Sequence, residues 1–131
     1  MALRLTLKPG ERVAINGAVI VNGERRAVFV VENQARVLRE GDILQPEDAD
    51  TPAKRIYLPI MLMYLDPATR DEMQPEYEKR LQEFAGALTN PEALRDCVSL
   101  AAHMANDDCY KALTVCQRLI DYEKARLAHV A

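Results

Sequence analysis

The sequence has little of what most catalytic sites are built from. Its 131 residues include one serine, Ser99, and two histidines, His103 and His129, and they contain neither a G-x-G-x-x-G pattern nor a P-loop pattern. Ser99 and His103 lie one helical turn apart and could pair as nucleophile and base, but two polar residues on a helix are the simpler interpretation. The carboxylates are spread over polar helix faces. We therefore expect a protein that is not an enzyme and that needs no cofactor.

Cysteine is also scarce. Cys97, Cys109 and Cys116 are odd in number, lie in helical sequence and include no C-x-x-C pair. Together with His103 they could be assembled into a zinc site, yet their spacing is not that of compact zinc ligands. We expect reduced, buried thiols, no metal site and no disulfide framework.

No hydrophobic run is long enough to cross a membrane. The longest, IYLPIMLMYL at residues 56–65, is too short to span a bilayer, and the N-terminal MALRLTLKPG lacks the apolar centre of a signal peptide. We therefore expect a cytoplasmic protein that does not act at a membrane.

The charge of the chain is small but unevenly distributed. The net charge is −3 and the isoelectric point is near 5.4, which excludes a generally basic coat for nucleic acid. Residues 1–40 nevertheless hold seven basic and four acidic side chains, whereas residues 60–131 hold eight basic and twelve acidic ones. Any binding of nucleic acid must therefore come from a local patch in the first part of the chain.

Residues 1–44 have the pattern of a small antiparallel β subdomain. Leucines alternate with polar residues from residue 3 to residue 8, and Pro9-Gly10 predicts a type II turn. Two Asn-Gly pairs, at 16–17 and 22–23, predict type I′ turns of hairpins. Strands joined by these turns would follow one another as a meander.

Two of these strands, AVIV and AVFVV, are apolar at every position instead of alternating. Such strands are covered on both faces. A subdomain of this size cannot cover them alone, so the sheet must pack on the helices or on a second copy of the chain. The second alternative predicts a homodimer through the β subdomain.

Residues 45–52 form an acidic linker with two prolines, and residues 53–131 follow as a helical subdomain. Thr51 and Pro52 are typical of a helix cap and first residue, and Pro59 would kink or restart this helix. Because the helix is apolar all round, we expect it in the core or in an interface. The residues proposed for a partner interface are Ile56, Tyr57, Ile60, Met61 and Tyr64.

Three further helices are predicted by apolar residues at helical spacing. The first begins at Pro75, the second is capped by Asn90, and the last starts at Asp107 or Asp108. The fold class is therefore α+β, an N-terminal antiparallel β subdomain followed by a C-terminal helical bundle.

The basic side chains of the β subdomain stand on short strands, where outer positions would display them together. An ordinary solvated sheet face, whose edge charges deter aggregation, would also explain these basic side chains. Composition alone favours this interpretation over nucleic-acid binding. The seven residues are Arg4, Lys8, Arg12, Arg25, Arg26, Arg36 and Arg39.

A family resemblance changes this balance. The block from RLTLKPGERVAINGAVIVNG to TPAKRIYLPIMLMYLD, followed by YKAL and LIDYE, is similar to the FlbT family of flagellum-biosynthesis repressors over nearly the whole chain. The resemblance implies association with the 5′ untranslated region of flagellin mRNA, with an effect on its translation or decay. It also implies a small helical flagellar regulator of the FlaF type as a partner.

Short segments also resemble the β domain of carbon-storage-regulator proteins, which dimerise by exchanging strands and bind GGA-containing RNA loops. These segments are LTLKPGE and VLREGD. Leu5 and Thr6 match that family, Lys8 keeps a basic position, and Arg39 matches the arginine of its late strand. Leu7 and Pro9 depart from its pattern and the linker after Gly41 is acidic. These departures bear on the GGA preference more than on RNA binding itself.

Together these observations predict a post-transcriptional repressor of flagellin expression whose β subdomain binds RNA. The alternative is a protein-interaction adaptor, or a module like an export chaperone, whose helices bind a partner and whose effects on RNA are indirect. The residues expected to contact RNA are Arg4, Leu5, Thr6, Lys8, Arg25, Arg26, Arg36 and Arg39.

Overall fold

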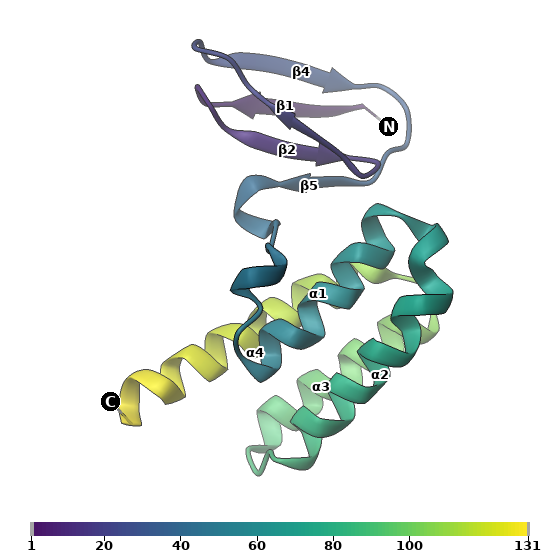
Figure 1. The fold of residues 1–131 in the computed structure, drawn as a ribbon, viewed down its shortest axis with the longest axis vertical. Helices are drawn as coiled ribbons and strands as arrows, with labels where there is room; N and C mark the ends of the chain where they lie inside the picture. The colour runs from purple at the N-terminus through teal and green to yellow at the C-terminus, as the bar shows by residue number, and fades with distance from the viewer. Residues whose placement is uncertain (1, 131) are drawn as a thin grey trace. The chain divides into compact units, whose positions relative to one another are not determined.

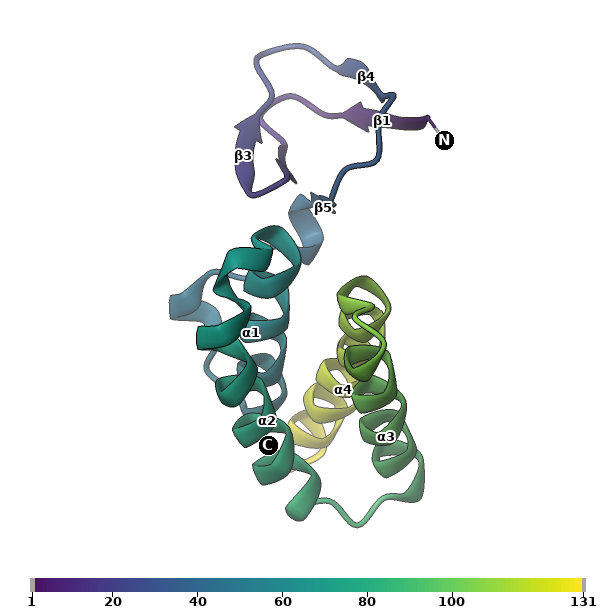
Figure 2. The same ribbon diagram turned by 90° about the vertical axis from the view of Figure 1, so that its right-hand side faces the viewer.

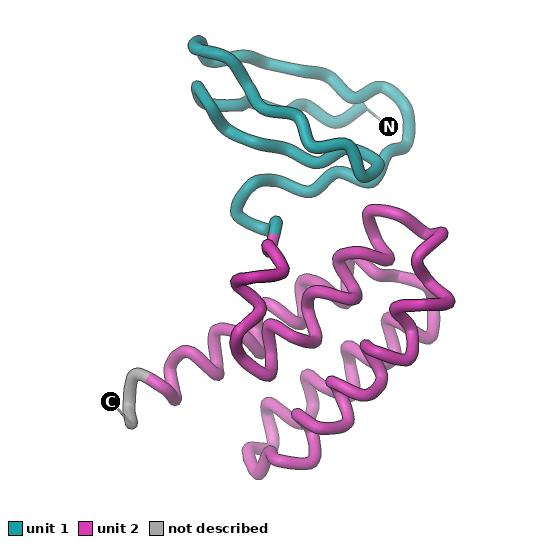
Figure 3. The backbone as a smooth tube through the Cα atoms, viewed as in Figure 1, with its two compact units in different colours: residues 1–43 teal, residues 44–131 magenta. Residues whose placement is uncertain are grey.

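The computed structural model describes residues 2–130, with side chains through residue 127. The chain is α+β and divides into two compact units, a β unit of residues 1–43 and a helical unit of residues 44–131 (Figure 3). The strands are β1 (Leu3–Leu7), β2 (Arg12–Ile15), β3 (Ala18–Val21), β4 (Ala27–Val31) and β5 (Val37–Arg39). The helices are α1 (Pro52–Leu65), α2 (Arg70–Gly86), α3 (Pro91–Ala105) and α4 (Cys109–Val130), with short 3₁₀ turns η1 (Glu40–Asp42), η2 (Pro46–Asp48) and η3 (Pro67–Thr69).

The strands form two small sheets instead of the predicted meander. β1 pairs antiparallel with β4, and β2 lies between β3 and β5 (Figure 1). Asn16 and Gly17 take φ values of 52° and 88°, so they form the expected turn between β2 and β3. The second Asn-Gly pair does not take this conformation, and the Asn22 side chain instead bonds to the Leu7 and Arg25 carbonyls. The meander prediction is therefore wrong at this pair.

The alternation of β1 decides which side chains form the core of the β unit. Leu5 and Leu7 are buried with Val13 of β2 and Val37 of β5, whereas Arg4 is exposed and Thr6 is half-buried. The Pro9-Gly10 turn forms as expected. Gly10 has a φ of 72°, and the turn closes where the Glu11 N–H donates to the Lys8 carbonyl at 3.1 Å.

The helix caps expected from the sequence are present. The Thr51 side chain accepts a hydrogen bond from the Lys54 N–H at 3.3 Å, and the Asn90 side chain accepts one from the Ala93 N–H at 3.0 Å. α1 runs through Pro59 as one helix. α2 begins at Arg70, five residues before the predicted start, and contains Pro75 in its interior.

α1 is the central helix of the helical unit, which explains why it is apolar on all sides. It packs against α2 and α4, and α3 packs against α4 (Figure 2). Four residues proposed for a partner interface are therefore core residues, since Ile56, Tyr57, Ile60 and Met61 are buried within the unit. Only Tyr64 is partly exposed, and its ring lies 5.7 Å from that of Tyr110 between ring centres. Within the described residues, no helix is sufficiently long and apolar to span a membrane.

The cysteines are free thiols, and they lie in the helical unit as predicted. Cys97 and Cys116 are buried and Cys109 is half-buried. Burial is the main cause that raises the pKa of all three thiols, most strongly for Cys116, which donates to the Ala53 carbonyl at 3.6 Å. Thiols with a raised pKa stay protonated at neutral pH and are poor nucleophiles.

We expect Cys116→Ala to lower the free energy of unfolding by about 1–2 kcal/mol, because it leaves a small cavity and removes the bond to Ala53. The half-buried Cys109 provides the control, and Cys109→Ala should cost less. Thermal unfolding followed by circular dichroism measures both. Equal costs for the two variants, or stoichiometric zinc in the purified protein, would contradict a purely structural role.

Candidate nucleic-acid interface

Five basic residues lie in or next to the loops at one end of the β unit. At this end β1 and β3 finish and β2 and β4 begin, so the connecting loops meet there. Arg39 ends β5 at the same end, because β5 runs antiparallel to β2 and pairs Arg39 with Val13. This pairing places Arg39 on the opposite face of the sheet from Arg12. We call this group the basic end, which consists of Lys8, Arg12, Arg25, Arg26 and Arg39.

The side chain of Asn22 holds the loops of the basic end together. The two hydrogens of its Nδ2 serve three carbonyls, those of Lys8 and Arg25 at 2.9 Å each and that of Leu7 at 3.2 Å, so one hydrogen is shared. Its Oδ1 accepts from the Gly23 N–H at 2.9 Å. One amide therefore joins the end of β1 to the connection between β3 and β4, and it places Lys8 near Arg25.

Backbone hydrogen bonds support the same arrangement. The Gly10 N–H donates to the Gly23 carbonyl at 3.0 Å, and the Asn22 N–H donates to the Glu11 carbonyl at 2.8 Å. The Glu11 carboxylate accepts from the Lys8 backbone N–H at 2.8 Å. The loops that carry the basic residues are thus positioned before any ligand binds, which lowers the cost of ordering them.

The cations at the basic end are available to an anionic partner. Lys8, Arg25 and Arg26 are exposed, and within residues 2–127 no carboxylate lies at ion-pair distance from them. The ion pairs of the described residues instead lie in the helical unit, as between Arg80 and Glu76 at 2.7 Å. Unpaired, exposed guanidinium and ammonium groups are suited to phosphate oxygens.

The other predicted RNA-contacting residues lie away from this end. Arg4 and Thr6 share the outer face of β1, where Arg4 is exposed and Thr6 is half-buried. Leu5 is 1% exposed and belongs to the core, so only its backbone is available to a ligand. Arg36 lies at the opposite end, where its N–H donates to the Asn16 side chain at 2.9 Å and its Nε is buried without a partner.

Sequence reasoning missed two members of this site. Arg12 was counted among the basic residues but not among those expected to contact RNA, and pairing with Val21 places it beside Asn22. Asn22 was interpreted as a turn residue. No local signal distinguishes it from Asn16, because both stand before glycine. The Asn16 side chain accepts from the Arg36 N–H, whereas the Asn22 side chain donates to three carbonyls.

The sequence also suggested a metal site and a nucleophile–base pair as alternatives. Among the described residues, no group of three histidine, cysteine or acidic side chains could hold a metal ion. Ser99 and His103 both lie on α3 and are half-buried, without a hydrogen bond between their side chains.

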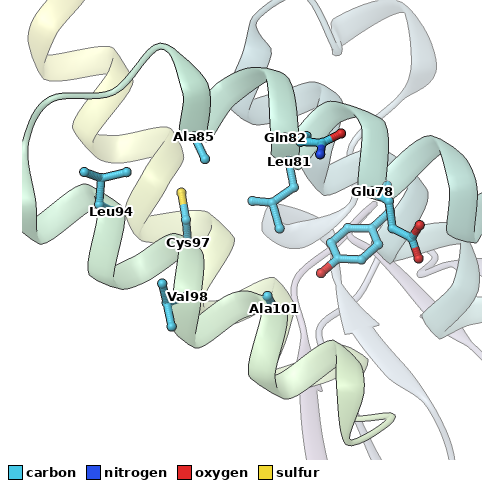
Figure 4. Close-up of a pocket in the computed structure, with 9 residues that line it drawn as sticks. Glu78, Leu81, Gln82, Ala85, Leu94, Cys97, Val98 and Ala101 are labelled. Carbon is cyan, nitrogen blue, oxygen red and sulfur yellow. The ribbon is translucent and has the colours of Figure 1, made fainter.

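The helical unit carries a second candidate site, an apolar groove of about 560 Å³ between α2 and α3 (Figure 4). α2 and α3 make little contact with each other, because α2 packs on α1 and α3 packs on α4. Val98 in the groove is 71% exposed, and burial raises the pKa of Tyr77 at its wall to about 12. The groove is lined by Tyr77, Glu78, Leu81, Gln82, Ala85, Leu94, Cys97, Val98 and Ala101.

Comparison with known proteins identifies the family. A family profile described as "Flagellar protein FlbT" matches residues 3–127. A probable flagellum biosynthesis repressor protein FlbT from Caulobacter sp. (strain K31) is 50% identical over the full length of both chains. The flagellum biosynthesis repressor protein FlbT of Caulobacter vibrioides (strain ATCC 19089 / CIP 103742 / CB 15) is 48% identical, covering 100% of this chain and 93% of its own.

A more distant relative shows the same correspondence. The probable flagellum biosynthesis repressor protein FlbT of Rhodopseudomonas palustris (strain TIE-1) is 37% identical over 98% of this chain and 99% of its own length. No solved structure shows a significant match. The agreement covers both units, and this chain belongs to the FlbT family of flagellar proteins.

Proposed function

We propose that this protein represses flagellum biosynthesis by binding the 5′ untranslated region of flagellin mRNA through the basic end of its β unit. The names of its relatives support the repressor role. One observation carries the RNA-binding part: Asn22 holds the loops of Lys8 and Arg25 together while their side chains remain exposed and unpaired.

The chemistry of RNA leaders suits this surface. RNA loops present unstacked bases and closely spaced phosphates, which proteins bind by combining cationic side chains with hydrogen bonds to base edges. The five cations supply the phosphate contacts. β1 pairs only with β4, so the backbone N–H and C=O groups on its other edge can bond to a base. The helical unit, with ten basic and fifteen acidic residues, would repel the rest of the RNA.

We expect the triple variant Lys8→Ala, Arg25→Ala, Arg26→Ala to lose most of its affinity for a flagellin leader. Each lost contact should cost about 1–3 kcal/mol. If all three side chains bind phosphates, the slope of log affinity against log salt should flatten by about 2. Leader binding is measured at several salt concentrations, and thermal unfolding should hardly change because the side chains are exposed.

The matched control removes the same charge from the helical unit. Lys79→Ala, Arg95→Ala, Lys124→Ala changes three exposed side chains on α2, α3 and α4. It should leave affinity and salt dependence close to those of the wild type. Equal loss in the two triple variants would show that net charge, and not the basic end, governs binding.

The groove between α2 and α3 favours a second candidate, an adaptor that binds a helical flagellar partner of the FlaF type. An amphipathic helix can lay its apolar face in such a groove. Val98→Glu would then remove partner binding, because it places a charge in the apolar lining. If the basic-end variant binds the leader as well as the wild type, and Val98→Glu alone relieves repression, the adaptor role replaces direct RNA binding.

A further inference from the structure

β3 and β4 expose apolar side chains on both of their faces. Successive residues of a strand point to opposite sides of the sheet, so Val19 and Ile20 cannot be covered by one partner surface lying on a single face. Among the described residues of the β unit, seven large hydrophobic side chains are 42% to 58% exposed, namely Leu3, Val19, Ile20, Val21, Val28, Phe29 and Val30.

Both strands also leave a backbone edge unpaired. β3 pairs on one side with β2, and β4 pairs on one side with β1. Neither strand contains a charge or a proline, the residues that normally protect an edge from pairing. The two other outer strands differ, because β1 carries Arg4 and β5 has only three residues and ends in Arg39.

We propose that a second copy of this chain covers these strands, with β3 of each copy pairing edge to edge with β4 of the other. The two strands have four and five residues, so their lengths match. A twofold axis repeats the contact and occupies the open edges of β3 and β4 in both copies at once. The dimer then contains two equivalent sheets. In each sheet β5, β2 and β3 of one copy are followed by β4 and β1 of the other.

The exposed apolar side chains contribute to such an interface. Six of the seven lie on β3 and β4, and a standard interface buries about 800 Å² per partner. The backbone edges contribute further area. A foreign peptide strand would occupy only one of the two edges and would leave the other exposed, whereas a second copy provides both edges.

The test is the mass of the full-length protein in solution, measured by light scattering without RNA, so that the result is independent of the proposed RNA binding. We expect twice the chain mass of 14.8 kDa. Val19→Lys, Val30→Lys should give the single chain mass, because lysine protects a strand edge. Leu127→Lys, which changes an equally exposed apolar residue on α4, should remain dimeric.

Hydrogen exchange of the wild type provides a second measurement if the double variant fails to fold. Amides of β3 and β4 should be protected from exchange in the dimer. Their protection should fall when the protein is diluted until light scattering gives the mass of one chain. A wild type that is monomeric at all concentrations overturns the proposal. So does a double variant that stays dimeric, or a dimer that only Leu127→Lys disrupts.

Discussion

Replacement of Ile60 by aspartate is expected to unfold the helical unit. Ile60 is 0% exposed and lies in the middle of α1, the helix that packs against both α2 and α4. A carboxylate placed there has no cationic partner, and breaking an apolar core in this way costs more than about 4 kcal/mol. That loss is comparable with the whole stability of a small unit. Circular dichroism should show loss of helix at room temperature.

Leu62 on the same helix is the matched control, since it is half-buried and lies only two residues away. Leu62→Asp should lower the free energy of unfolding by about 1–2 kcal/mol and keep the helical spectrum. If Ile60→Asp unfolds at the same denaturant concentration as Leu62→Asp, α1 is not the centre of the core. The contrast thus distinguishes a buried helix from one that is merely apolar and lies in an interface.

The helical unit could be predicted from sequence because its signals are local. Thr51 and Asn90 bond to a backbone N–H three residues later, so a cap is visible within one turn of sequence. The start of α2 was misplaced because Pro75 is typical of a first helical residue, whereas Asp66 caps η3 and the chain continues directly into α2. The sequence did not decide whether α1 lies in the core or in an interface. The packing of α1 against α2 and α4 decides it.

The β unit could be predicted as a set of strands but not as a set of pairs. Asn16 and Asn22 both precede glycine, and only the first forms a hairpin turn. The strand pairing and the basic end depend on bonds between loops more than ten residues apart, which no local propensity encodes. Composition therefore identified the basic residues of the site, and only the fold shows that Lys8 and Arg25 meet while Arg36 does not join them.

Asn22→Ala is expected to release the loops of the basic end. The variant removes the hydrogen bonds of Nδ2 to three carbonyls and of Oδ1 to the Gly23 N–H. These bonds are partly exposed, so together they contribute about 2–3 kcal/mol, and affinity for a flagellin leader should fall as the positions of Lys8 and Arg25 become less defined. Asn22→Asp should be at least as damaging, because it turns a carboxylate oxygen toward the same carbonyls.

The measurement must report on the β unit itself. All five tyrosines lie in the helical unit and the chain has no tryptophan, so fluorescence would not detect the change. Hydrogen exchange at Gly10 and Gly23 reports the local opening free energy directly. Asn33→Ala, an exposed asparagine between β4 and β5, should leave that free energy unchanged. If Asn22→Ala behaves like Asn33→Ala, the backbone bonds alone hold the loops, and Asn22 does not position the cations.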